Sequence, residues 1–370
     1  MQNDIITEKK DKDLQRKVTI KGLTLDELKA WFEEKGLPKF RGEQVFNWMY
    51  NHLAVDFDEM QNLPKAMRAE LKASAEIQAL GYVASEISPG SGTKKYIFET
   101  AEKNKIESVI IPEEKRTTLC ISTQVGCPLD CQFCATGLMG YKKNLTAGEI
   151  FDQYMLAAKD YGKDNITNIV YMGMGEPLLN YNNTIKSLQI FSEELTTGIS
   201  LKKITVSTAG IAPKIKELAD TGLKVKLALS LHSCFEDIRS KIMPINKKYS
   251  LKETLEACRL YAAKTGTRIT FEYVMLQDVN DRKEDINALV RLCSKIPSKI
   301  NVIPFNSLAH MNPGGFAAEL KPTSKRRIAE FVQKLRDRNL TVMVRETQGE
   351  DIAAACGQLA VKFQEKSPKV

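Results

Sequence analysis

Three cysteines stand close together in the segment GCPLDCQFCATG, at Cys127, Cys131 and Cys134. Structural zinc sites usually take two pairs of ligands, and no second cysteine pair with that spacing follows. Thiolates also bind iron–sulfur clusters, and a four-iron cluster takes four cysteines for full ligation. Three ligands therefore predict a cubane with one iron open to a substrate or cofactor. The alternative is a zinc site in which Cys120 or Cys356 is the fourth ligand.

Other residues that could bind a ligand follow predicted strands. In GMGEP, residues 173–177, the glycines allow a ligand to approach the backbone, and Glu176 offers a carboxylate to a cationic amine. A plain strand-to-helix turn would have the same composition. Ser207 ends the next predicted strand, and His232 and Asn306 follow two later ones, although His232 alone could be a structural histidine. Loops at the carboxyl ends of strands build active sites in such folds, which favours function for these positions.

The remaining cysteines are harder to interpret. A free buried cysteine usually packs as a small apolar side chain, and this is the interpretation for Cys258 and Cys293 in predicted helices. Cys120 lies on the predicted strand that leads into the three-cysteine loop. Cys356 lies in the small-residue run AAACGQL, and the sequence leaves open whether it packs or is exposed. Cys234 is ambiguous.

From residue 118 onward, strand patterns alternate with helix patterns, for example a helix over 146–161 with a capping-box pattern at Thr146 and Glu149. Repeated βα units predict a parallel sheet with right-handed crossovers, either an open barrel or a doubly wound sheet. The candidate strands cover residues 118–122, 167–172, 203–207, 224–231, 268–275, 299–305 and 341–345.

The N-terminal part is predicted to be helical after a flexible tail, residues 1–17. Thr24 and Glu27 form another capping-box pattern, EQVFNWMYNHL has helical spacing, and a third helix is expected after Pro64. The first 75 residues hold 13 basic and 13 acidic residues, so the rest of the chain carries the whole net charge of +8. This modest excess is compatible with an RNA partner, or with solubility alone.

The composition excludes some classes of protein. No apolar run approaches the roughly 20 residues that span a bilayer, and the N-terminus lacks the apolar core of a secretory signal. A cytoplasmic protein without a membrane partner is expected, and its eight cysteines should be reduced rather than form a disulfide framework.

The spacing C-x3-C-x2-C after the first strand of a βα series resembles the radical S-adenosylmethionine (SAM) superfamily. The segments RTTLCISTQVGCPLDCQFCATG, YMGMGEPLLN, VSTAG, LSLHS, IPFN and GEDIAAACGQL together resemble the RlmN family of adenine-C2 RNA methyltransferases. That family shares a branch with the adenine-C8 methyltransferases of the Cfr type. The resemblance covers nearly the whole chain, including the N-terminal helices.

The resemblance implies an α/β fold, a partial (β/α)6-type radical SAM barrel with a small helical accessory domain. The implied division of the chain is a helical domain over 18–78 that binds RNA, a β-rich extension over 79–112, a radical SAM core over 113–346 and a C-terminal segment over 347–370. It also implies a [4Fe–4S] cluster on Cys127, Cys131 and Cys134, with SAM on the open iron. The implied SAM-binding residues are Gly175, Glu176, Ser207, Ser230, Leu231, His232 and Asn306.

The resemblance further implies a mechanism. Adenine C2 has no lone pair, so direct polar transfer of a methyl group from SAM fails there. In the family, one SAM methylates the thiolate of Cys356, and a radical from a second SAM takes a hydrogen from that methyl group. The resulting methylene radical adds to C2, and Cys120 releases the product as a Cys120–Cys356 disulfide forms. Glu107 is implied to handle a proton at the adenine, although a solvent-facing carboxylate is its plainer interpretation.

The implied substrates are an adenosine at the peptidyl-transferase centre of 23S rRNA and an adenosine in the tRNA anticodon loop. The implied electron donor is of the flavodoxin or ferredoxin type, and a monomer is expected. Two alternatives remain open from the sequence. One is methylation at adenine C8, and the other is a zinc-stabilised RNA-binding protein without catalysis.

Overall fold

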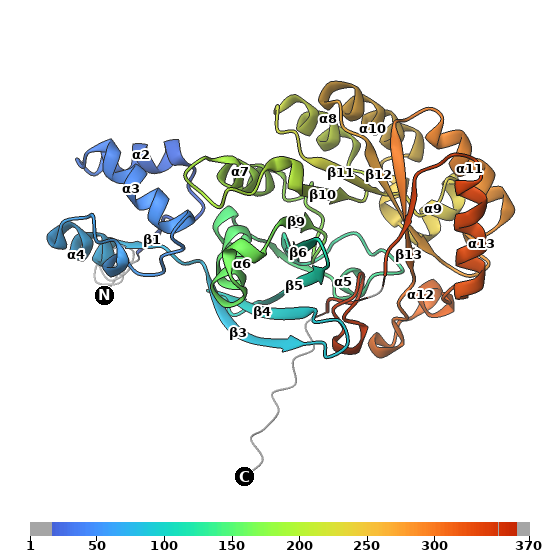
Figure 1. The fold of residues 1–370 in the computed structure, drawn as a ribbon, viewed down its shortest axis with the longest axis horizontal. Helices are drawn as coiled ribbons and strands as arrows, with labels where there is room; N and C mark the ends of the chain where they lie inside the picture. The colour runs from blue at the N-terminus through green and yellow to red at the C-terminus, as the bar shows by residue number, and fades with distance from the viewer. Residues whose placement is uncertain (1–16, 347, 361–370) are drawn as a thin grey trace, which may run out of the picture.

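A ten-stranded sheet forms the centre of the computed structural model, which describes residues 17–346 and 348–360 (Figure 1). All of the expected tail except Lys17 lies outside the described residues. Seven strands run parallel, in the order β14, β13, β12, β11, β10, β9 and β6 across the sheet. They are β6 (Arg116–Cys120), β9 (Asn168–Tyr171), β10 (Ile204–Thr208), β11 (Lys226–Ser230), β12 (Ile269–Met275), β13 (Ser298–Pro304) and β14 (Val342–Val344).

Three antiparallel strands continue the sheet beyond β6, namely β5 (Lys105–Glu113), β4 (Lys94–Thr100) and β3 (Leu80–Ile87). In the described part of the chain, the end strands β3 and β14 do not pair with each other, so the sheet does not close into a barrel. The α/β fold class and the open parallel arrangement predicted from the sequence are confirmed.

Helices connect the parallel strands and cover the outer side of the sheet, where Figure 1 shows α8, α10, α11 and α13 around strands β10 to β13. The predicted capping box at Thr146 begins α6, because Thr146 Oγ1 accepts from the Glu149 amide and the Glu149 carboxylate accepts from the Thr146 amide. The helices that follow strands are α6 (Ala147–Tyr161), α7 (Tyr181–Ser192), α8 (Ala212–Asp220), α9 (Glu236–Ile242), α10 (Leu251–Thr265), α11 (Lys283–Cys293), α12 (Gly315–Glu319) and α13 (Lys325–Arg336).

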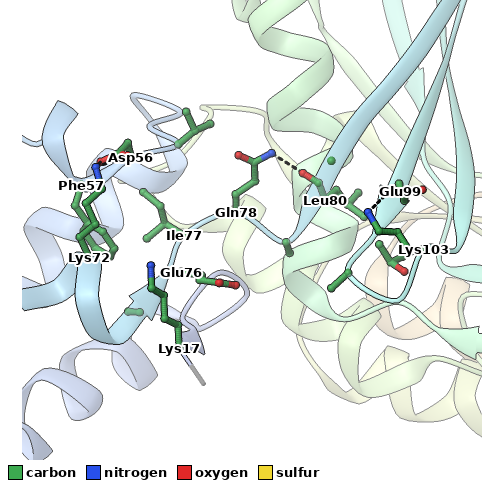
Figure 2. Close-up of a pocket in the computed structure, with 16 residues that line it drawn as sticks. Lys17, Asp56, Phe57, Lys72, Glu76, Ile77, Gln78, Leu80, Glu99 and Lys103 are labelled. Carbon is green, nitrogen blue, oxygen red and sulfur yellow. Dashed lines mark hydrogen bonds and ion pairs between the residues drawn. The ribbon is translucent and has the colours of Figure 1, made fainter. Parts of the chain in front are cut away.

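The N-terminal helices lie beside the barrel in Figure 1 and are α2 (Leu25–Glu34), α3 (Lys39–Tyr50) and α4 (Lys65–Ser74). Thr24 begins α2 with the expected capping box. Figure 2 shows the pocket where this helical region meets the sheet, with Lys72 on the helical side and Glu99 and Lys103 on the strand side. Both lysines are paired with acids, Lys72 with Asp56 and Asp58, and Lys103 with Glu99.

After β14 the chain returns across the sheet, and Figure 1 shows this last segment close to the short helix α5 (Ala135–Leu138). Several hydrogen bonds hold it: Lys95 donates to the Ile352 carbonyl, the Ala135 amide to the Gly357 carbonyl, Thr136 Oγ1 to the Leu359 carbonyl and the Ala360 amide to Glu107, among others. No helix within the described residues is long and apolar enough to cross a membrane.

Candidate active site

The three-cysteine loop follows β7 (Gln124–Gly126) and leads into α5, whose N-cap is Cys134. The Cys127 amide donates to the Gly140 carbonyl over 3.0 Å, and the Cys134 amide donates to the Cys131 carbonyl over 3.1 Å. Gly126 has a φ of +73°, and a Cβ there would overlap the Gly140 carbonyl oxygen. Only glycine therefore fits at the start of this loop.

Cys127, Cys131 and Cys134 all line one cavity, so the loop presents its three thiols to the same space. Burial raises the pKa of all three thiols, and that of Cys127 reaches about 12. Binding of a metal would displace these protons, since the thiolate is the ligand. Three sulfur donors suit iron–sulfur chemistry.

The zinc alternative needs Cys120 or Cys356 as a fourth ligand. Cys356 lines the cavity together with the three thiols, whereas Cys120 does not.

Six of the seven residues expected to bind SAM line the same cavity as the cysteines, and Leu231 does not. Leu231 is fully buried, its amide donates to the Glu272 carbonyl, and its carbonyl accepts from Arg239 Nε. Leu231 therefore packs in the core, whereas the residues on either side of it, Ser230 and His232, line the cavity. The six lining residues are Gly175, Glu176, Ser207, Ser230, His232 and Asn306.

The carboxylate of Glu176 is buried and faces the β10–α8 loop. Its Oε2 accepts from the Ala209 amide over 2.7 Å and its Oε1 from the Leu178 amide over 3.0 Å. Burial raises the pKa of Glu176 to about 7, although these two hydrogen bonds act in the opposite direction. The neighbouring Gly175 has a φ of +99°, and a Cβ there would overlap Gln124, whose amide oxygen holds the Glu176 N–H. The turn is therefore built around Glu176.

His232 lies at the end of β11 with a buried ring. Its Nδ1 accepts from the Val274 amide over 3.0 Å, and Phe133 packs edge-on against the ring at 4.5 Å between centroids. Burial lowers the pKa of His232 to about 3, so the imidazole is neutral at physiological pH. With Nδ1 accepting, Nε2 carries the proton and is the ring's remaining donor.

Cys120 and Glu107 lie on the inner face of the sheet beside the cavity, although neither lines it. Val109 on β5 pairs with Cys120 on β6, and side chains two residues apart on a strand share a face, so Glu107 and Cys120 point to the same side. Cys356 lines the cavity, and its carbonyl accepts from Asn306 Nδ2 over 3.1 Å. Burial and the nearby Cys356 raise the pKa of Cys120 to about 12. The structure thus brings Cys120 and Cys356 near each other from distant parts of the chain.

Glu107 does not face solvent, so the plainer interpretation of this residue is wrong. Its side chain is 2% exposed, Oε2 accepts from the Ala360 amide over 3.0 Å, and Oε1 lies 3.6 Å from Lys95 Nζ. The other cysteines lie elsewhere: Cys258 is buried on α10 and Cys293 half-buried on α11, and neither lines the cavity.

Two charged residues of the cavity were missed by the sequence reasoning. Glu272 on β12 is buried, lines the cavity and accepts from Asn301 Nδ2 over 2.7 Å. Arg345 follows β14, also lines the cavity, and a thiolate at Cys356 raises its pKa. Both could have been found, because Glu272 is the one acid in the apolar run ITFEYVM and Arg345 ends a predicted strand as Ser207 does.

The chain is similar to known proteins along most of its length. Residues 121–293 match the family model of the radical SAM superfamily, and residues 18–77 match that of the ribosomal RNA large subunit methyltransferase N-terminal domain. A dual-specificity RNA methyltransferase RlmN from Pelobacter propionicus is 44% identical over 350 residues, which are 95% of this chain and 98% of the relative. The chain belongs to the RlmN family.

Other RlmN relatives and a crystal structure extend this assignment. A probable dual-specificity RNA methyltransferase RlmN from Thermotoga neapolitana is 43% identical over 94% of this chain and 98% of its own length. The crystal structure of a radical SAM methyltransferase from Sphaerobacter thermophilus superposes with a TM-score of 0.86 at 41% identity, over 92% of this chain and 99% of that one. Membership of the RlmN family makes this chain a SAM-dependent RNA methyltransferase with an iron–sulfur centre, and RNA its substrate.

Proposed function

We propose that this RlmN-family enzyme methylates C2 of an adenosine in 23S rRNA, at the peptidyl-transferase centre, and of an adenosine in the tRNA anticodon loop. The observation that carries the proposal is the placement of Cys356 in the cavity of the three-cysteine loop, with Cys120 close by on the inner face of the sheet. The dual specificity named for the relatives supports two RNA substrates.

Cys127, Cys131 and Cys134 would hold a [4Fe–4S] cluster, with SAM beside it. When bound, this cluster supplies the electron that cleaves SAM reductively to a carbon radical. In the proposal, Glu176 receives the amino group of SAM, which favours the ionised carboxylate over the protonated form that burial promotes. Ser207, the neutral His232 and their neighbours orient the rest of the molecule by hydrogen bonds.

Cys356 is the proposed methyl carrier. Its thiolate displaces S-adenosylhomocysteine from one SAM to give S-methylcysteine, and the positive Arg345 lines the same cavity. After hydrogen abstraction from the methyl group, the methylene carbon on Cys356 would bond to C2 of adenine, and the adduct would give one electron back to the iron–sulfur centre. Glu107 would accept the C2 proton or position the base. Cys120 would then attack the sulfur of Cys356; the bond between sulfur and the methylene carbon breaks, that carbon takes up a proton to become the methyl group of the released RNA, and the two cysteines form a disulfide that an external thiol must reduce.

The proposal also includes the setting of the reaction. The expected electron donor is of the flavodoxin or ferredoxin type, the expected compartment is the cytoplasm, and a monomer is expected to act. The helical region matched by the N-terminal family model is proposed to contribute to RNA binding. The β-rich extension and the C-terminal segment are proposed to complete the cavity around Glu107 and Cys356.

Anaerobic reconstitution with iron and sulfide, followed by SAM and RNA fragments, tests the proposal. The expected products are 5′-deoxyadenosine and 2-methyladenosine, with iron and sulfide in equal amounts on the protein and an extra methyl group on Cys356 by mass spectrometry. Cys356→Ala should abolish RNA methylation, whereas Cys293→Ala, a matched change outside the cavity, should not. Formation of 8-methyladenosine alone would move the enzyme to the C8 branch, and turnover by Cys356→Ala would refute the two-cysteine scheme.

A further inference from the structure

A second, strongly basic pocket lies at the opposite end of the sheet from the candidate active site. Its charged lining residues are Lys202, Lys224, Lys226, Arg268 and Lys299, and it contains no Asp or Glu. These residues stand at or just before the amino ends of β10, β11, β12 and β13. No part of the proposed reaction uses this pocket.

The strand register places the pocket at the end of the sheet's inner face that lies opposite the active-site cavity. Ala228 on β11 pairs with Thr270 on β12, and Thr270 pairs with Lys299 on β13, so Lys226, Thr270 and Lys299 share one face of the sheet. Further along the strands, this face carries Ser230, two residues after Ala228, and Glu272, two residues after Thr270, and both line the active-site cavity. The inner face therefore has a reaction end and a basic end.

The five cations of this pocket repel one another, and none of its described lining residues is an acid. In the described part of the chain, none of the five forms an ion pair, whereas Lys72 and Lys103 of the pocket in Figure 2 are paired with acids. Lys299 is half-buried, and burial together with Lys226 and Arg268 lowers its pKa. Glu272 acts on the pKa of Lys299 in the opposite direction, but its carboxylate already accepts a hydrogen bond from Asn301. An anion that enters the pocket would relieve this mutual repulsion.

We infer that this basic pocket binds phosphate groups, and that they are backbone phosphates of the RNA substrate. The inference rests on RNA methyltransferase activity but not on the methylated position. Four of the cations are exposed around the opening of the pocket, namely Lys202, Lys224, Lys226 and Arg268, and Lys299 is half-buried. This arrangement suits an RNA backbone that passes over the opening. The pocket lies at the other end of the strands from Cys356, so the phosphates belong to nucleotides remote from the target adenosine.

Salt dependence of RNA binding gives a direct test. The double variant Lys226→Gln/Arg268→Gln removes two exposed cations of the pocket. The matched control, Lys325→Gln/Lys334→Gln, removes two exposed cations of α13 and changes the net charge equally. Binding of an unmodified tRNA transcript to the reconstituted enzyme is measured by fluorescence anisotropy from about 0.05 to about 0.3 M salt. Screening of exposed charges increases over this range. The slope of log K against log salt should become shallower by about 1.4 to 1.8 in the pocket variant only.

Each outcome decides the source of the phosphate. A slope change confined to the pocket variant supports RNA, and titration with inorganic pyrophosphate, read by thermal shift, tests a free phosphate ligand. Stabilisation by pyrophosphate that the pocket variant loses, without a slope change, supports phosphate binding but assigns it to a small ligand. Equal slopes and equal pyrophosphate responses in both variants overturn the inference. Because binding is read without turnover, failure to form 2-methyladenosine would refute the proposed function and leave this result intact.

Discussion

Three buried carboxylates, Glu107, Glu176 and Glu272, face the interior of the open barrel, and each has a different partner. Glu107 lies near the ammonium of Lys95, Glu176 accepts two backbone amides, and Glu272 accepts from Asn301. Burial favours the neutral form of a carboxyl group, and a nearby cation favours the ionised form. Burial raises the pKa of Glu176 to about 7, and it also raises that of Glu272, where Arg345 acts in the opposite direction.

The raised pKa of Glu176 predicts a pH-dependent stability. The folded carboxyl keeps its proton up to about pH 7, whereas the unfolded one releases it near 4.5. The contribution of Glu176 to the free energy of unfolding is therefore fully present below pH 4.5. It is lost as the pH rises to 7, and the loss reaches about 3 kcal/mol. Urea unfolding of the cluster-free protein should show this loss relative to Glu176→Gln, while the exposed Glu319→Gln follows the wild type. Parallel curves for wild type and Glu176→Gln would contradict the prediction.

At the scale of elements, the parallel strands and helix starts could be predicted from the sequence. The apolar run at β12 and the capping boxes at Thr24 and Thr146 are local patterns, and local patterns fix local structure. The residues that follow these strands, including Ser207 and His232, were located for the same reason, since parallel strands bring their carboxyl ends to one edge.

The placement of the C-terminal segment could not be predicted, because its contacts use backbone groups. The carbonyls of Ile352, Gly357 and Leu359 accept hydrogen bonds from distant residues, and a backbone group leaves no mark in the sequence. The burial of Glu107 escaped prediction for a related reason. Strand β5 is covered on one face by this segment and on the other by α6, where Gln153 accepts from Ser108, so both faces are buried.

Lys95 is expected to hold the C-terminal segment against the sheet. Lys95→Met removes the donor to the Ile352 carbonyl and the cation beside Glu107, a charged hydrogen bond worth about 1.5 to 3 kcal/mol. Amide hydrogen exchange in peptides covering 350–360 should become faster. The neighbouring Lys94→Met is the control, because Lys94 points to the opposite face and pairs with Asp160. Equal exchange in the two variants would show that Lys95 does not anchor the segment.

On the scale of the whole molecule, a buried ion pair joins the helical region to the barrel. Lys21 Nζ lies 3.3 Å from Asp152 on α6, and both side chains are fully buried. Asp152 also accepts from the amides of Ala79 and Leu80, where the chain passes from the helices into β3. Lys21 further donates to the Met49 carbonyl at the end of α3. One pair of charges therefore joins the helices, the linker and α6.

Breaking this pair should release the helical region before the barrel unfolds. Lys21→Met leaves the Asp152 carboxylate buried without its cation, which costs about 3 to 5 kcal/mol. In the same region, Lys29→Met removes an exposed pair with Glu43 and should cost under about 1 kcal/mol. Limited proteolysis in increasing urea should therefore cut residues 18–77 of Lys21→Met at a lower concentration than in Lys29→Met, with later cleavage of the barrel in both. Asp152→Asn is then added to Lys21→Met; if it restores part of the resistance to proteolysis, the unpaired charge of Asp152 causes the loss. If Lys21→Met and Lys29→Met are cleaved at the same urea concentration, apolar packing alone holds the helical region.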